Sequence, residues 1–145
     1  MMHETRSIPT GFERHYRQSP VTDPWEPLYS RKTDQAVILG FVAEAAHTNS
    51  RGFVHGGLIS ALADNAMGLS CARQLGDAAS LVTVNLTLDF MGSAQIGQWL
   101  EFDTVFVKPG GTLSFTQAFV TADGQPCARA NAVFRMVRKA VAEVA

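Results

Sequence analysis

A single helical segment stands among segments typical of strands, and this order constrains the fold more than any other feature of the sequence. Between about residues 57 and 74, apolar side chains recur at three- and four-residue steps, which predicts an amphipathic helix, and Gly76 is suited to end it. One helix cannot cover both faces of a five-stranded sheet. We therefore expect it to bury one face and the other face or an edge to favour self-association.

The segments around this helix carry strand and turn signals. The segment "QAVILGFVAEA", from Gln35, precedes the helix and is rich in β-branched and aliphatic residues. The segment "LVTVNLTLDFM" follows it and alternates strictly, which predicts that Val82 and Val84 share one face and Thr83 and Asn85 the other. The turn signals "PGG" and "ADGQ" divide the rest into three further strands. The order is strand, helix, then four strands in an antiparallel meander.

Composition limits the class of protein and its partners. A chain of 145 residues with 46% hydrophobic and 17% charged residues fits one globular domain. Its formal net charge of -1 predicts no general affinity for nucleic acid or anionic membrane. Cys71 and Cys127 have no CxxC spacing, so we expect neither a disulfide framework nor a metal site. Without a secretory signal or an apolar run of ~20 residues, a cytoplasmic protein is expected.

Residues 1–33 form a polar, proline-rich arm, and residues 34–145 form the single main domain. The prolines prevent a long helix, although "TGFERHYRQ" could form a short one. Aromatic side chains gain by burial, so we expect the arm to pack on the domain rather than to remain a free tail. The residues expected to make this contact are Phe12, Trp25, Leu28 and Tyr29.

Asp64 is the unusual residue of the predicted helix. On a helical wheel it lies opposite the apolar stripe, among small residues, and no Lys or Arg occupies the positions three or four residues away. Two interpretations of Asp64 remain open. Asp64 is either a solvated residue beside a subunit contact, or a carboxylate without a cation partner that serves as a general base or nucleophile.

The sequence His55-Gly56-Gly57 stands where this helix begins. The first N–H groups of a helix lack intrahelical partners and carry partial positive charge, and glycines leave them sterically open. Such a terminus can hold a phosphate or polarise a carbonyl oxygen. The first use is weakly supported because GxGxxG and GK[ST] are both absent. His55 alone is more often a loop residue bonded to backbone than a catalyst.

The pattern N-x5-HGG-x7-D, formed by Asn49, His55-Gly56-Gly57 and Asp64, resembles the hotdog-fold acyl-CoA thioesterases of the phenylacetic-acid-degradation type, called PaaI-like. The likeness covers about residues 35–137. It implies an α+β hotdog fold, in which a five- to six-stranded antiparallel sheet wraps one long central helix. The spacing from HGG to the aspartate is the specific part of the pattern, whereas the strands are generic.

The resemblance implies a role for each matching residue. Asp64 would be the catalytic carboxylate, and the Gly56 N–H would polarise the thioester carbonyl. Asn49 and His55 would be the polar pair near that carbonyl and the water, and Thr83 would stand close to the carboxylate. The site would lie at a homodimer interface, with Asn49, His55 and Gly56 of one subunit facing Asp64 and Thr83 of the other. Dimers of this family often pair into tetramers.

The resemblance also implies an acyl-CoA substrate, with no cofactor because coenzyme A is part of that substrate. The acyl pocket would draw on the small face of the helix and on the Trp25–Tyr29 part of the arm, and the coenzyme phosphates would need cations. The helix residues expected to bind substrate are Gly57, Ser60, Met67 and Gly68. The candidate cations are Arg51, Lys108, Arg138 and Lys139, with Lys108 the first choice because it precedes the Pro-Gly-Gly turn.

A second class of function remains open. The same fold could serve as a non-catalytic module that binds acyl-CoA as a sensor, since fold does not determine function. A sensor normally carries an effector segment, and the arm of residues 1–33 is too short and too rich in proline for a helix-turn-helix. A hotdog dehydratase would place its histidine and acid differently. Thioester hydrolysis is therefore the leading hypothesis.

Overall fold

The computed structural model describes residues 6–76 and 80–137. Its one α-helix is α1 (Gly56–Leu75), and two short 3-10 helices precede it, η1 (Asp23–Trp25) and η2 (Ala45–His47). The strands are β1 (Glu13–Arg14), β2 (Tyr29–Lys32), β3 (Val37–Val42), β4 (Ser80–Phe90), β5 (Trp99–Lys108), β6 (Leu113–Ala122) and β7 (Gln125–Val137). None of the helices in the described ranges is both long and apolar enough to cross a membrane.

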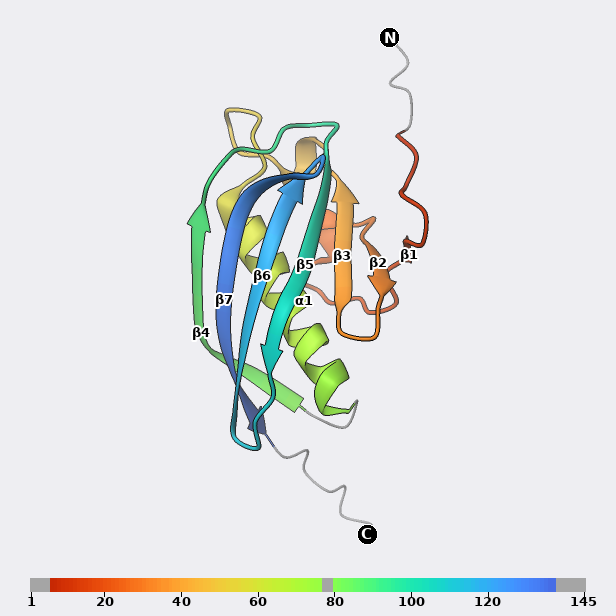
Figure 1. Cartoon of the computed structure of the whole chain (residues 1–145). Helices are drawn as coiled ribbons and strands as arrows, with labels where there is room; N and C mark the ends of the chain where they lie inside the picture. The colour runs from red at the N-terminus through yellow and green to blue at the C-terminus, as the bar shows by residue number, and fades with distance from the viewer. Residues whose placement is uncertain (1–5, 77–79, 138–145) are drawn as a thin grey trace.

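All seven strands belong to one antiparallel sheet in the order β1-β2-β3-β5-β6-β7-β4. The sheet curves around α1, which runs across its concave face (Figure 1). The predicted hotdog architecture is therefore confirmed. The sheet has seven strands rather than the expected five or six because the arm adds β1 and β2 beyond β3.

The helix forms the centre of the core, as its apolar periodicity predicts. Leu62, Ala66 and Met67 are at most 1% exposed and face Phe41 and Phe102 of the sheet, which are fully buried. Gly76 ends the helix with a φ of 86°, a conformation that costs glycine little. The "ADGQ" turn is also as expected, because Asp123 and Gly124 both have positive φ, as a tight hairpin turn of this kind requires.

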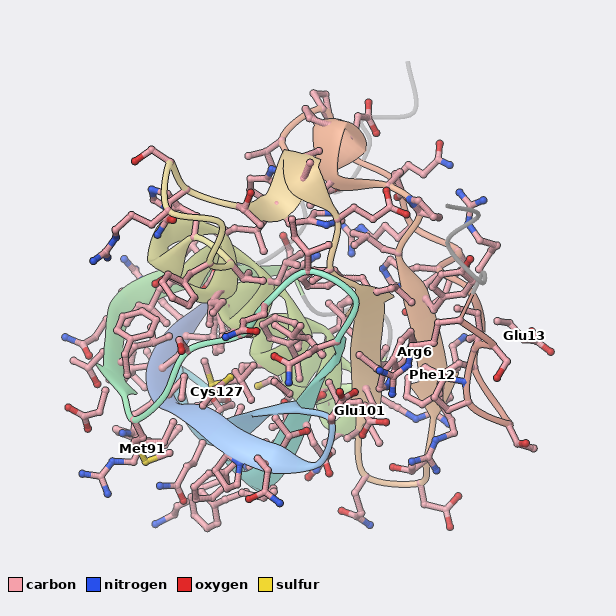
Figure 2. The ribbon with its side chains drawn as sticks, turned by 90° about the horizontal axis from the view of Figure 1, so that it is seen from above. Arg6, Phe12, Glu13, Met91, Glu101 and Cys127 are labelled. Carbon is pink, nitrogen blue, oxygen red and sulfur yellow. The ribbon has the colours of Figure 1, made fainter. Side chains whose placement is uncertain are left out.

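The arm packs on the sheet beside β3. The Phe12 ring lies 5.1 Å from the Trp99 ring, centroid to centroid, in an edge-to-face arrangement, and the Tyr29 ring lies 6.1 Å from Trp99. Leu28 is 2% exposed and Trp25 packs against the core, so each of the four residues expected to make contact does so. The arm residues Arg6, Phe12 and Glu13 lie on the opposite side of the molecule from Met91 (Figure 2).

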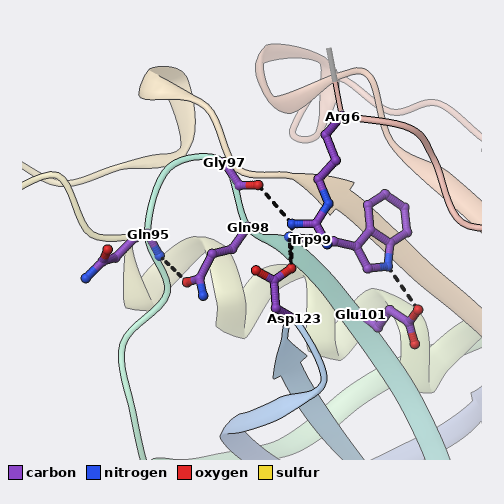
Figure 3. Close-up of polar contacts among 7 residues, drawn as sticks. All are labelled: Arg6, Gln95, Gly97, Gln98, Trp99, Glu101 and Asp123. Carbon is purple, nitrogen blue, oxygen red and sulfur yellow. Dashed lines mark hydrogen bonds and ion pairs between the residues drawn. The ribbon is translucent and has the colours of Figure 1, made fainter. Parts of the chain in front are cut away.

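Two details of the arm qualify the sequence interpretation. The segment "TGFERHYRQ" contains no helix, because Glu13 and Arg14 pair with β2 and gain sheet hydrogen bonds instead. Further towards the N-terminus, the Arg6 guanidinium donates to the Gly97 carbonyl, in the loop before β5, at 3.1 Å and pairs with Asp123 of the β6–β7 turn at 2.6 Å (Figure 3). Asp123 in turn accepts from the Trp99 N–H, which ties the arm to the β6–β7 turn.

Candidate active site

Asp64 lies half-buried on α1, and its carboxylate faces β4. The Thr83 hydroxyl donates a hydrogen bond of 2.6 Å to Asp64 Oδ1. No cation pairs with Asp64 among the described residues. A short bond from a neutral donor fixes one carboxylate oxygen and leaves the charge in place. The second oxygen, Oδ2, therefore remains available to a water or a substrate.

A β-bulge gives Thr83 this orientation. The register of β4 on β7 shifts between Thr83 and Asn85, which leaves Val84 without a direct partner. Thr83 lies opposite the buried Phe134, whereas Val82 lies opposite the exposed Arg135. Residues opposite each other in an antiparallel pair share a face, so Thr83 points towards the helix.

The strict alternation expected for this strand is therefore wrong at one point. Beyond the bulge, Leu86 and Leu88 lie opposite the buried Ala132 and Ala130, on the same face as Thr83 rather than the opposite one. The extra residue at Val84 changes the phase of the strand. Alternation of side chains cannot reveal such an insertion, because every position still carries a residue suited to a strand.

His55 caps the N-terminus of α1 through its own ring. The Gly57 N–H donates to His55 Nδ1 at 2.8 Å, which consumes one of the free helix donors. Because Nδ1 is the acceptor, a neutral ring carries its proton on Nε2, which becomes a donor. A Cβ added at Gly57 would stand 2.9 Å from His55 Nδ1, so glycine at this position allows the ring to fold back.

The Gly56 N–H, by contrast, has no partner among the described residues. It is the first N–H of α1, at the positive end of the helix dipole. The Phe90 ring of β4 lies beside it, 3.3 Å from where a Cβ would stand. An open donor beside an aromatic ring is suited to bind a carbonyl oxygen while water is partly excluded.

Asn49 organises the loop that leads into this helix. Its Oδ1 accepts from the Arg51 N–H at 2.9 Å and from the Phe53 N–H at 3.2 Å, and Gly52 turns the chain with a φ of 81°. These bonds use the carbonyl oxygen of the side chain and leave the amide nitrogen as a donor. The loop is fixed from behind, since the His55 N–H donates to the carbonyl of the buried His47 at 2.9 Å.

A cavity of about 580 Å³ lies against Asp64 and extends along the C-terminal half of α1. Its wall on the helix comprises Asp64, Asn65, Gly68, Leu69, Ala72 and Arg73. The sheet contributes Lys32, Val37, Ser80, Leu81, Thr83 and Phe134, and the arm contributes Tyr16, Arg17 and Ser19. The arm thus lines the cavity, although through these residues rather than through the expected Trp25–Tyr29 segment.

The other residues expected to bind substrate lie in different places. Gly68 lines the cavity, whereas Met67 is fully buried in the core. Ser60 donates to the Gly56 carbonyl at 2.8 Å, within the first turn of α1. Arg51 is exposed in the Asn49 loop. Their roles in binding substrate, and that of Gly57, stay predictions.

The expected phosphate-binding cations are equally separated. Lys108 is exposed and lies opposite Phe115 in the β5–β6 register, on the sheet face that does not carry the helix. Arg138 and Lys139 lie outside the described residues. Sequence inspection did not single out Arg17, Lys32 and Arg73, because nothing in the local pattern separates them from ordinary surface cations.

The expected catalytic residues form two groups at separate points of one chain. Asp64 and Thr83 form one group, and Asn49, His55 and Gly56 form the other. Gly56 and Asp64 are eight residues apart on the same helix, which places them about 12 Å apart along its axis. A single carbonyl cannot contact both groups of the same chain.

Cys71 does not provide a competing nucleophile. It is fully buried in the core, and burial raises the pKa of its thiol, with a smaller opposing contribution from Ser114. It therefore serves as a packing residue of the core. The chemistry of the site depends on a carboxylate and on N–H and O–H donors.

The sequence that carries these side chains matches a known protein family. The family model described as Thioesterase superfamily matches residues 51–128, more than half of the chain. The chain belongs to the thioesterase superfamily. It is accordingly a thioester hydrolase of the hotdog fold, as the HGG-to-aspartate pattern predicts. The match spans the Asp64 helix and β4 through β6.

Similar proteins carry related names. The chain is 34% identical over 131 residues to the Pseudomonas aeruginosa protein named "Putative esterase PA0474", a match that covers 90% of this chain and 98% of that protein. It is also 34% identical over 87 residues to human acyl-coenzyme A thioesterase 13, covering 59% of this chain and 60% of that protein.

A solved structure supports the fold. A point mutant of the phenylacetic acid degradation protein PaaI from Thermus thermophilus superposes with a TM-score of 0.70 at 22% sequence identity. The superposition covers 81% of this chain and 99% of that protein. The predicted membership is therefore confirmed in family by the thioesterase superfamily match and in architecture by this superposition.

Proposed function

We propose that the protein hydrolyses an acyl- or aryl-CoA thioester to a free acid and coenzyme A. The observation that carries this is the pairing of Asp64 with Thr83 in the wall of a cavity, on a helix whose N-terminus offers an open Gly56 N–H. The relative named acyl-coenzyme A thioesterase 13 supports the choice of substrate class. Coenzyme A belongs to the substrate, and the proposed chemistry requires no further cofactor.

The reaction requires an attacking oxygen and a donor for the carbonyl oxygen. In one version, Asp64 accepts a proton from a water, whose oxygen attacks the thioester carbon. In the other, an Asp64 oxygen attacks directly and water then hydrolyses the mixed anhydride. In both versions the C–S bond breaks, the sulfur leaves and is protonated, and the Gly56 N–H stabilises the negative carbonyl oxygen.

The remaining residues position these groups. Thr83 orients the Asp64 carboxylate through the 2.6 Å bond to Oδ1. His55 offers an Nε2–H donor because its Nδ1 is occupied by the Gly57 N–H. The free amide nitrogen of Asn49 supplies another donor at the loop. These donors suit the thioester carbonyl and the water.

We propose that two subunits form each site. Within one chain, Gly56 and Asp64 are about 12 Å apart along the helix axis, so the carbonyl donor must come from a second chain. Strand β4 provides the route to a dimer, because it is a long edge strand with Val82 and Val84 about half exposed. Pairing of two β4 edges would bring the Asp64 of one chain near the helix terminus of the other.

Two such dimers could pair further through the outer face of the sheet. This face exposes large apolar side chains, Phe106, Leu113 and Phe115, which are 42–52% exposed. They lie on the neighbouring strands β5 and β6 and form a patch of a kind that often marks a subunit contact. A Phe115→Asp variant should reduce a tetramer to dimers in light scattering and leave kcat nearly unchanged.

The central experiment is steady-state hydrolysis of a panel of aryl- and fatty-acyl-CoAs. Asp64→Asn should lower kcat by about 10²- to 10⁴-fold, the scale of losing a general base. Asp34→Asn, an equivalent change at an exposed turn, serves as the matched control and should keep full activity. An Asp64→Asn enzyme with wild-type kcat would end the proposal.

Two further measurements distinguish the alternatives. A single turnover in ¹⁸O-water introduces label into Asp64 only if that carboxylate attacks the thioester. Tight binding of acyl-CoA by the wild-type protein without any turnover would favour the sensor function instead.

A further inference from the structure

The cavity beside Asp64 changes in character from one end to the other. At one end stand the Asp64 carboxylate and Thr83. Between the two ends the walls are mainly small and apolar, with Asn65 and Ser80 as polar residues among Gly68, Leu69, Ala72, Leu81 and Phe134. At the other end lie three cations from three different segments: Arg17 of the arm, Lys32 of β2 and Arg73 in the last turn of α1.

Specific contacts hold these three cations near one another. Arg73 Nε donates to the Thr33 carbonyl at 2.7 Å, which brings the end of α1 against the residue that follows Lys32. Lys32 Nζ lies 4.1 Å from the centroid of the Tyr16 ring, and Tyr16 directly precedes Arg17 in the chain. None of the three forms an ion pair among the described residues, and Asp64 is the one acid among the described residues of the cavity.

The pKa of a neighbouring histidine, His15, also reflects this positive charge. Burial is the main cause that lowers the pKa of His15, and the charges of Arg17 and Lys32 lower it further, against an opposing contribution from Glu26. Three unpaired cations facing one space attract an anion, and guanidinium groups bind carboxylates with good geometry.

From this arrangement we infer that the protein prefers acyl groups that end in an anion, namely ω-carboxyacyl thioesters, and that Arg17, Lys32 and Arg73 determine this specificity. The inference rests on the proposed thioesterase function and adds the class of acyl group. Asp64 and Arg73 are nine residues apart, about 13 Å along the helix axis, so a medium-length chain can span from the reacting carbonyl to the cations.

The phosphates of coenzyme A are a second source of negative charge that the three cations could bind. The residues that line the cavity disfavour this alternative. To reach the cations, the pantetheine arm would place its two amides along Leu69, Ala72 and Phe134, which offer no side-chain hydrogen-bond partner, and only Asn65 and the serines of the lining could bond to them. A methylene or aryl spacer suits this stretch, with Gly68 and Ala72 leaving room beside the helix. The acyl group therefore fits the cavity better than the coenzyme does.

The test compares matched substrates and variants. We would measure kcat/KM for adipoyl-CoA against hexanoyl-CoA, and for suberoyl-CoA against octanoyl-CoA, in the wild type and in Arg17→Gln, Lys32→Gln and Arg73→Gln. The cations are exposed, so we expect the wild type to prefer the carboxylated member of at least one pair by about 10-fold at low salt, less in high salt. Each variant should reduce this preference and leave hexanoyl- and octanoyl-CoA nearly unchanged. Arg135→Gln, an exposed control on β7, should change neither the preference nor the rates.

Other results would overturn the inference in distinguishable ways. Equal kcat/KM for carboxylated and uncharged chains, unaltered by the variants, rejects the anion preference and leaves the thioesterase proposal standing. If the variants weaken all CoA thioesters equally but do not affect the corresponding pantetheine thioesters, the cations bind coenzyme phosphates instead. If no thioester is hydrolysed and Asp64→Asn changes nothing, the proposed function itself fails.

Discussion

The two edges of the sheet differ in how far they are closed. The edge at β1 is a strand of two residues, and the arm around it is fixed by contacts to Trp99, Gly97 and Asp123. The edge at β4 is eleven residues long and leaves Val82, Val84 and Phe90 about half exposed. A short, covered edge resists further pairing, whereas a long apolar edge invites it. The comparison indicates that the sheet can extend through β4 and not through the arm.

The difference also bears on function. The closed edge contributes to the cavity through the arm, and the open edge carries Thr83, the partner of Asp64. Substitutions at the β1 edge and its arm should therefore lower the stability of the fold. Substitutions at the β4 edge should instead impair dimer assembly and catalysis. The following predictions test this division.

The largest effect is expected where the arm of the closed edge packs on β5, from Trp99→Ala. Trp99 is 4% exposed and packs against Phe12 and Tyr29, and its ring fills the space above Gly40. Removing a buried indole should lower the free energy of unfolding by about 3–5 kcal/mol. Urea unfolding followed by circular dichroism measures this. A loss below about 1 kcal/mol would show that the arm is not held by this contact.

At the open edge, the double variant Val82→Lys and Val84→Lys should separate the proposed dimer. Two lysines on an edge strand oppose pairing with a second copy. We expect a monomer in light scattering and a fall in kcat/KM of about 100-fold or more, since Asp64 then lacks the partner's Gly56 donor.

The matched control for this variant lies in the arm. Val21 is 66% exposed, so Val21→Lys should alter neither mass nor activity. An active monomeric double variant would show that one chain suffices for catalysis.

A smaller effect, confined to acid conditions, is expected from His15 in the arm. Burial lowers the pKa of His15 in the folded state, so below about pH 6.5 the unfolded chain binds a proton that the folded chain resists. Stability from this residue is complete above that pH and is lost as the pH falls. His15→Gln should flatten the dependence of the urea midpoint on pH between about 7.5 and 5. If the wild type and His15→Gln show the same dependence of the urea midpoint on pH, a group other than His15 is responsible for it.

The smallest effect is expected from Arg6→Ala. The ion pair of Arg6 with Asp123 is 39% and 38% exposed on its two sides, and exposed pairs contribute about 0–1 kcal/mol. The thermal midpoint should fall by a few degrees at most, and the difference should vanish in about 1 M salt. A larger loss that persists in salt would mean that the guanidinium contributes through its bond to Gly97.

Sequence patterns predicted the helix, its glycine end and the positions of the two hairpin turns, because helix periodicity and turn chemistry are local. They also singled out Asp64 and the HGG terminus, whose residue types are unusual for their positions. They missed the bulge at Val84 and the cluster of Arg17, Lys32 and Arg73. Both depend on which distant segments meet, and that information is absent from any one stretch of sequence.

The unpartnered residue in β4 has a consequence for protein engineering. Deleting Val84 should restore an unbroken ladder on β7, which is the ordinary arrangement for an antiparallel strand. The same deletion would leave Thr83 opposite Phe134 and Leu86 opposite Ala132, so the shortened chain should keep Thr83 on the helix face, beside Asp64. A gene one codon shorter could thus encode the same architecture and the same acid–hydroxyl pair on a straighter edge strand, because a bulge bends the strand that carries it.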